Sequence, residues 1–467
     1  MQRCSAISLQ LQIGIEVACQ AFNCCSVASI FDSAAIKFTI GTQVMYRETR
    51  SFEMSKHFAR FLLPFIFCLI CDGISITTND KQKFTRKTHV FKESMPDLSS
   101  NDMIRFDRVE NGSIHEVVFV IRQRNMEELT RILHDVSDPM SPNYGHHLTQ
   151  DQVTTMTSNP ESRDVVLSYL NSVGSKVKKV TRGGEYIIAE APLTVWENVF
   201  KAEFFTFRQI LPNGENLAAV RANAYSVPSE LDAHVESVLN IIEVPIPTRF
   251  PIIQKSVDLS QTTAYMTPKK IRSSYNIGST VGGSVDSRQA VFASIGLYFS
   301  PNDLKLFQAS QGLANQPIAR SYGNHVSDSK CIADPNICTE PNLDVQYMMA
   351  TSPRSPTTFW YVDSSFTSWL IQVAMDTSLP LVLSISYGAE ENKVSLASSD
   401  AFNTQAIKLS IMGVTILAAS GDDGAVSNTV RNGNTQRCGY EPDFPASSPY
   451  VTAVGATSVR CSAAGSF

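Results

Sequence analysis

The pattern of apolar and polar residues divides the chain into two regions with different predicted structures. In residues 106–244, β-type runs such as Val117–Val120 alternate with segments whose apolar residues recur at helical spacing, such as Met126–Val136. Strands and helices mixed within so short a span predict a small α+β domain. The other elements expected there are a helix over Ser162–Val173, strands over Lys176–Val180 and Glu185–Ala191, and a helix over Pro192–Ala202.

The second region, residues 267–467, alternates apolar strand-like runs with helical runs. Strands are expected at Ala290–Gly296, Leu381–Ser386 and Val414–Ala419, and helices at Phe366–Asp376 and Asp400–Ile411. This alternation predicts a parallel sheet with helices on both faces, and such sheets bind ligands at the carboxyl ends of their strands. We therefore expect the chemistry in the loops after Ser386 and Ala419.

The flanking segments have other patterns. Residues 54–73 have a basic start, an apolar middle too short to span a bilayer and a small-residue exit, which is the order of a signal peptide. Because that order begins at Met54, residues 1–53 are interpreted as an upstream extension or a gene-model error. The polar residues 74–105 predict a flexible lead-in, and the proline-containing residues 245–266 predict an exposed linker.

The composition is that of a globular protein without a nucleic-acid partner. Of 467 residues, 43% are hydrophobic and 18% are charged, and the net charge of −5 leaves no basic excess for nucleic acid or an anionic membrane. Beyond the signal, Cys331, Cys338, Cys438 and Cys461 permit two disulfides in an oxidising compartment. Proximity favours a bridge between Cys331 and Cys338, while the other pairings and free thiols remain open.

Two carboxylates are expected one helical turn apart. The segment Glu340–Met349 has the pattern of a helix start, because Pro341 is tolerated in a first turn and apolar residues follow at helical spacing. Glu340 and Asp344 would repel each other in water and share a proton when buried, as a proton carrier requires. Spacing alone also fits two solvated acids, but the apolar neighbours leave this helix little room to be solvated all round.

A third acid follows a predicted strand. Val414–Ala419 leads directly into Ser-Gly-Asp-Asp-Gly, which puts Asp422 at the carboxyl edge of the sheet on glycine-flanked backbone. An ordinary acidic turn, or a metal site using Asp422 and Asp423, are the alternatives. The only histidine of this region, His325, stands in a segment expected to be a solvated loop, so a carboxylate is the better candidate for a general base.

Four blocks together resemble the sedolisins, a family of serine-carboxyl peptidases. In chain order, the blocks are Glu340–Met348, Ser386–Gly388, Ser420–Gly424 and Phe444–Gly455. Residues 106–244, most clearly Ser137–Leu148, resemble the family's propeptide. The resemblance implies a subtilisin-like α/β parallel sheet with flanking helices, incomplete in this chain and preceded by a small α+β propeptide domain.

The resemblance also implies a role for each acid. Glu340 would be the general base toward a serine, Asp344 would orient it and share its proton, and Asp422 would line the oxyanion hole. A carboxylate base and a protonated Asp422 both suit an acid compartment. The expected localisation is the secretory pathway, ending in a lysosome or outside the cell. The family's nucleophile and its calcium loop lie further downstream, so both are expected beyond Phe467, and Ser458 is a poor substitute because the family has an ordinary strand there.

The sequence thus predicts the precursor of an acid-acting serine-type peptidase, in a chain that is itself incomplete and inactive. Its partners would be peptide or protein substrates and its own propeptide, with calcium only in a complete member. The alternative is a non-catalytic pseudoenzyme or a propeptide-type inhibitor of a related peptidase. Subtilisin proper is disfavoured because its base is a histidine. Release of tripeptides and internal cleavage are both left open.

Overall fold

The computed structural model describes residues 88–96, 103–110, 112–210, 216–244, 266–278, 282–362, 365–422, 424 and 440–457. The predictions for residues 1–53, 54–73 and 245–265 lie outside these ranges, as do Cys438, Ser458 and Cys461. No helix of the described part has the length and hydropathy needed to cross a membrane.

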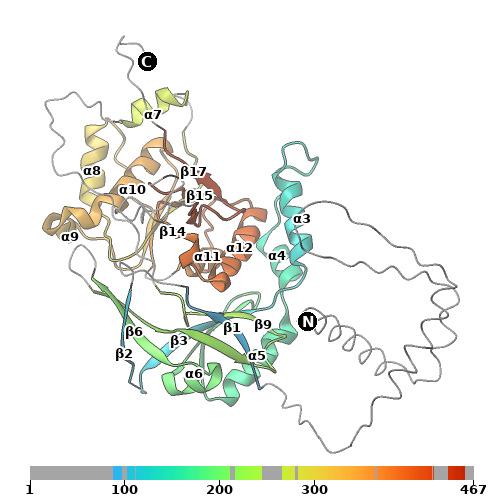
Figure 1. Ribbon diagram of the computed structural model, residues 1–467. Helices are drawn as coiled ribbons and strands as arrows, with labels where there is room; N and C mark the ends of the chain where they lie inside the picture. Colours follow the sequence, from blue (N-terminus) through green and yellow to red (C-terminus); the bar gives the residue numbers. More distant parts are fainter. Residues whose placement is uncertain are drawn as a thin grey trace, which may run out of the picture. The chain divides into compact units, whose positions relative to one another are not determined.

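The region before residue 245 combines antiparallel sheets with helices (Figure 1). A four-stranded sheet has the order β4 (Lys176–Val180), β5 (Tyr186–Pro192), β3 (Ile114–Ile121) and β9 (Val235–Leu239). The other strands are β2 (Ile104–Arg108), β6 (Phe204–Ile210) and β7 (Asn216–Ala222) in one sheet, and β1 (His89–Ser94) with β8 (Ala224–Pro228) in another. The helices are α3 (Met126–Ser137), α4 (Gln150–Thr157), α5 (Pro160–Ser172) and α6 (Leu193–Phe200).

The alternation of strand β3 explains the core of this region. Val117, Phe119 and Ile121 point to one face and are buried in one cluster with residues of α5 and α6. Trp196 stacks on Phe200 of the same helix with ring centroids 5.6 Å apart. The strand and helix positions predicted from the sequence are present, so the apolar pattern of this region was a sufficient guide to them.

Part of the expected flexible lead-in, residues 74–105, is a strand. His89–Ser94 forms β1, which pairs antiparallel with β8. The prediction was wrong for these residues because the hydrogen-bonding partner lies far along the chain, where local polarity gives no sign of it.

The region after residue 266 is built on a parallel sheet of the order β11-β12-β10-β13-β15-β17 (Figure 1). Its strands are β10 (Gln289–Ala293), β11 (Arg320–Tyr322), β12 (Thr357–Tyr361), β13 (Val382–Ile385), β15 (Thr415–Ala419) and β17 (Thr452–Val454). The helices are α7 (Pro268–Ser274), α8 (Pro301–Ser310), α9 (Asp328–Ala333), α10 (Thr339–Thr351), α11 (Phe366–Ala374) and α12 (Leu396–Ile411). Short elements are β14 (Ala389–Glu390), β16 (Asp443–Phe444) and the 3-10 helices η2 (Pro335–Cys338) and η3 (Glu391–Lys393).

Helices cover both faces of this sheet. Along β10, Ala290 and Phe292 belong to the core cluster that contains α11 and α12. Val291 and Ala293, which point the opposite way, belong to the cluster that contains α8 and α10. The predicted parallel sheet with flanking helices is therefore present, and α10 lies on a different face from α11 and α12.

Helix α12 joins the two regions. Glu93 of β1 accepts hydrogen bonds from the first backbone N–H groups of this helix, from Leu396 at 2.5 Å and Ala397 at 3.2 Å. At the other end, the backbone N–H of Leu148 donates to the carbonyl of Ile411 at 3.0 Å. Residues of the first region thus satisfy polar groups that a helix leaves unpaired at both of its ends.

Candidate active site

The two expected carboxylates lie on α10. Glu340 occupies the first turn and Asp344 follows one turn later, as the spacing predicted. Oδ1 of Asp344 accepts a hydrogen bond of 2.6 Å from Oγ of Ser386, which follows β13. Oδ2 is buried and, while both acids are ionised, has no donor among the described residues. Because two carboxylates cannot donate to each other, a hydrogen bond between Glu340 and Asp344 requires a proton on one of them.

Burial and mutual repulsion shift both carboxyl groups. Burial, followed by the negative charge of Asp422, raises the pKa of Glu340 from 4.5 to about 7, against a hydrogen bond with Asp344 that lowers it. Burial, followed by the charge of Glu340, raises the pKa of Asp344 well above 3.8, although the Ser386 hydrogen bond lowers it. The pair therefore holds a proton at pH values where an ordinary carboxyl group has lost it.

Asp422 lies at the end of the neighbouring strand. Strand β15 pairs parallel with β13, so the segment after Ala419 and the segment after Ile385 leave the sheet at the same edge. Gly421 has a φ of +85°, a conformation that glycine adopts without steric cost. Asp422 is exposed to solvent, yet its charge reaches Glu340. In the structure, Glu340 therefore interacts electrostatically with both of the other expected acids, Asp344 and Asp422.

The Ser386–Gly388 block contributes two groups to which the sequence assigned no role. Ser386 is the hydrogen-bond donor to Asp344 described above. Tyr387 is buried, and burial together with the charges of Asp344 and Glu340 raises its pKa well above 10, so its hydroxyl keeps its proton. The block itself was the available signal, because a polar pair directly after an apolar strand lies at the sheet edge where ligands bind.

Comparison with known proteins shows what this chain is similar to. The model of the "Pro-kumamolisin, activation domain" matches residues 101–244. "Tripeptidyl-peptidase 1" of Canis lupus familiaris is 30% identical over 379 residues, covering 76% of this chain and 64% of that protein. The Homo sapiens protein of the same name is 32% identical over 366 residues, covering 74% of this chain and 62% of that protein. The chain is thus similar to proteins of this name over about three quarters of its length.

The chain spans somewhat less than two thirds of the length of those two relatives. A solved structure, "Pseudomonas sedolisin (serine-carboxyl proteinase) complexed with two molecules of pseudo-iodotyrostatin", is 20% identical and covers 43% of this chain and 55% of that one. Its TM-score of 0.31 is too low to establish the fold.

His325 is not the solvated loop residue that the sequence predicted. Its ring stacks on the ring of Tyr361 and also packs against the ring of Tyr298, whose centroid lies 4.5 Å from that of His325. The backbone explains the difference, because Phe299 donates its N–H to the His325 carbonyl and pairs in parallel with Val326. This local pairing holds the segment against the sheet of the sedolisin-like region.

The described part of this chain offers no metal centre. In those ranges, no three His, Cys, Asp or Glu side chains gather so that they could hold an ion. Asp423, which with Asp422 suggested a metal site as an alternative, lies outside the described residues. Calcium therefore remains a prediction for a complete family member, and the chemistry proposed below uses none.

Proposed function

We propose that this chain is the precursor of an acid-acting serine-type peptidase that hydrolyses peptide bonds. The observation that carries the proposal is the half-buried Glu340–Asp344 pair, whose pKa values are raised beside the charge of Asp422. Perturbed carboxyl pairs of this kind are typical of groups that move protons. In the proposed mechanism Glu340 takes the proton of a serine hydroxyl, Asp344 holds the shared proton, and Asp422 donates a hydrogen bond to the developing oxyanion.

Protonation of Asp422 would serve two of these roles together. As a base, Glu340 must be ionised, but the negative charge of Asp422 favours its protonated form. A proton on Asp422 removes that repulsion and lowers the pKa of Glu340. The same proton turns Asp422 into the donor that an oxyanion needs.

We do not assign the nucleophile to Ser386. Its hydroxyl donates to Asp344 and not to Glu340, the proposed base, so its position fits a group that orients the pair. The serine that Glu340 would activate is expected in the family's Gly-Thr-Ser segment. We further propose a subtilisin-like fold for the peptidase and passage through the secretory pathway, supported by the disulfide between Cys331 and Cys338.

Activity at acid pH tests the proposal. Protein expressed from the full transcript would be freed of residues 101–244 and incubated with fluorogenic tripeptidyl and internally quenched peptides at acid and neutral pH. We expect hydrolysis that is stronger at acid pH and is abolished by Glu340→Gln and Asp344→Asn. Asp286→Asn, which changes an exposed carboxylate in a turn, is the matched control and should leave the rate unchanged.

The same assay separates the alternatives. Cleavage of the tripeptidyl substrate alone would agree with the names of the two relatives, whereas cleavage of the quenched peptide would indicate an endopeptidase. Hydrolysis that Glu340→Gln leaves intact would refute the proposed base. An authentic stop after codon 467, together with inhibition of a related peptidase by residues 101–244, would favour the non-catalytic inhibitor.

A further inference from the structure

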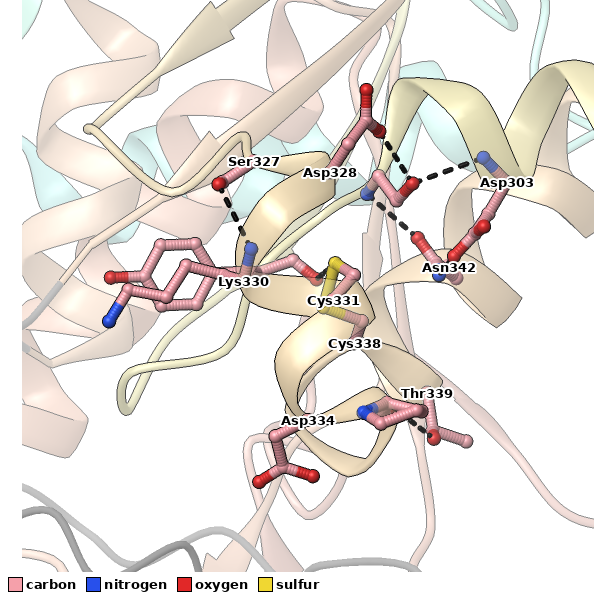
Figure 2. The surroundings of a disulfide bond; sticks show 12 residues. Asp303, Ser327, Asp328, Lys330, Cys331, Asp334, Cys338, Thr339 and Asn342 are labelled. Carbon is pink, nitrogen blue, oxygen red and sulfur yellow. Dashed lines mark hydrogen bonds between the residues drawn. A yellow bond between two sulfur atoms is a disulfide. The ribbon is translucent and has the colours of Figure 1, made fainter.

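The start of α10 is tied to the preceding segment by a disulfide. Figure 2 shows the bond between Cys331 of α9 and Cys338, the last residue of η2, directly before α10 begins at Thr339. This is the pairing that proximity favoured. Both half-cystines are buried, with 5% and 1% of their surface exposed. The disulfide therefore fixes the point at which the chain enters α10.

A second tie is made by Asn342, in the same first turn. Its Oδ1 accepts a hydrogen bond of 3.0 Å from the backbone N–H of Ser300. Its Nδ2 donates to Oδ2 of Asp303 at 2.9 Å. Ser300 in turn donates from Oγ to Oδ1 of Asp328 at 2.7 Å, so the starts of α8, α9 and α10 are joined (Figure 2).

Four other helices of the same region have a feature that α10 lacks. Helices α8, α9, α11 and α12 each begin at a serine whose side chain accepts a hydrogen bond from the helix backbone. The residue at that position of α10 is Cys338, which makes no such side-chain bond. The 3-10 helix η2, which is capped by Asp334, runs directly into α10, and the disulfide and Asn342 link the first turn of α10 to α9 and α8.

Glu340 lies between the two ties, two residues after Cys338 and two residues before Asn342. We propose that the Cys331–Cys338 disulfide and Asn342 are positioning elements that hold Glu340 against Asp344 and Asp422. The inference rests on the proposed function for the meaning of that position. A first turn that is free to rotate or fray carries the Glu340 carboxyl into solvent and away from the Asp422 charge.

The titration of Glu340 is the readout, because a merely stabilising tie would leave it unchanged. Infrared spectra of the full chain would follow the carboxyl groups with pH, and Glu340→Gln would assign the Glu340 band. We expect a pKa of about 7 in the unchanged protein and a fall toward 4.5 in Asn342→Ala and in the double variant Cys331→Ala/Cys338→Ala. Ile332→Ala, at a position 79% exposed on α9 next to Cys331, is the control and should titrate like the unchanged protein.

Two substitutions of Asp303, one that keeps the hydrogen-bond acceptor for Asn342 and one that removes it, give a second test. Asp303→Asn keeps an oxygen that can accept from Asn342, so the pKa of Glu340 should stay at about 7. Asp303→Ala removes that acceptor and should lower the pKa. This pair decides the question if the double cysteine variant fails to fold.

The outcomes separate this inference from the proposed function. A pKa of about 7 that persists in folded Asn342→Ala and Asp303→Ala overturns the positioning role and leaves the proposed function standing. The expected shifts in an enzyme whose hydrolysis survives Glu340→Gln support the positioning role and overturn the proposed function. An unchanged protein that titrates near 4.5 overturns the inference.

Discussion

The ion pair between Lys408 and Glu185 should contribute much of the stability of the contact between the two regions. Lys408 lies on α12 and Glu185 directly before β5, and Nζ and Oε1 are 2.9 Å apart. Only 6% and 12% of the two side chains are exposed. Lys408 also donates to Oε1 of Gln123 at 3.2 Å, so its charge is satisfied by the first region.

Replacing Lys408 with methionine keeps the length of the side chain and removes its charge. Breaking a buried pair by removal of one partner costs roughly 3–5 kcal/mol, because the other charge stays buried. Glu185 can avoid that cost by taking up a proton. At 1.36 kcal/mol per pH unit, this costs about 3.4 kcal/mol at pH 7 for a carboxyl group of pKa 4.5. The two values agree, so we expect a loss of about 3 kcal/mol in the free energy of unfolding.

The loss should depend on pH. Burial alone would raise the pKa of Glu185, but the charge of Lys408 and the hydrogen bonds to the carboxylate lower it below 4.5. A lowered pKa contributes stability that is present above pH 4.5 and is lost as the pH falls through the folded-state value. Lys408→Met should therefore differ most from the unchanged protein at neutral pH, and the difference should shrink as the pH approaches 4.5.

Urea unfolding followed by tryptophan fluorescence measures this effect in both regions, because Trp196 lies in the first core and Trp369 in the second. Lys408→Met combined with Glu185→Gln is the control. It leaves no charge in the contact and should recover most of the loss. A loss below about 1 kcal/mol at pH 7, typical of an exposed ion pair, or a loss that the double variant fails to recover, would refute the reasoning.

Three further changes test the site and the fold. Asp422→Asn removes the charge that raises the pKa of Glu340, so that pKa should fall below about 7 in an infrared titration; an unchanged value would contradict the contact. Ser386→Ala removes the hydrogen bond that favours ionised Asp344, so the pKa of Asp344 should rise further in the same titration. Gly413→Ala should destabilise by about 1–3 kcal/mol in thermal unfolding, because φ is +87° and the new Cβ would lie 2.9 Å from His147. Gly312→Ala, with φ of +66° and nothing within 4 Å, should cost less, and equal losses would exclude the clash.

Local patterns were sufficient for several elements and not for others. Strand β4 has the bounds Lys176–Val180 that the sequence predicted, although four of its five residues are exposed and its register with β5 shifts between Val177 and Lys179. Helix α4 was missed although Thr149 and Gln152 form a capping box, which is a signal readable from sequence. Strand β1 could not be found in this way, because it depends on pairing with β8.

For the candidate site, too, the sequence predicted some features and could not predict others. The spacing of Glu340 and Asp344 predicted one helix, and that helix is present. Spacing could not show that the Asp344 carboxyl is buried and bound to Ser386, a contact between residues 42 positions apart. Spacing also could not show how Cys338 and Asn342 hold the start of the helix. The hydrogen bond from Ser300 to Asn342 joins residues that are likewise 42 positions apart in the sequence.

The sheet order explains why these distant residues meet. Strands β13 and β15 are parallel neighbours, so Ser386 and Asp422 emerge at the same edge. Helix α10 packs on one face of the sheet through Val345 and Met349, and this packing sets where Asp344 meets Ser386. The raised pKa of Glu340 is therefore a property of the sheet topology and the helix position together. A change in strand register moves every side chain of β15 to the opposite face and would separate the acids even with every motif letter unchanged.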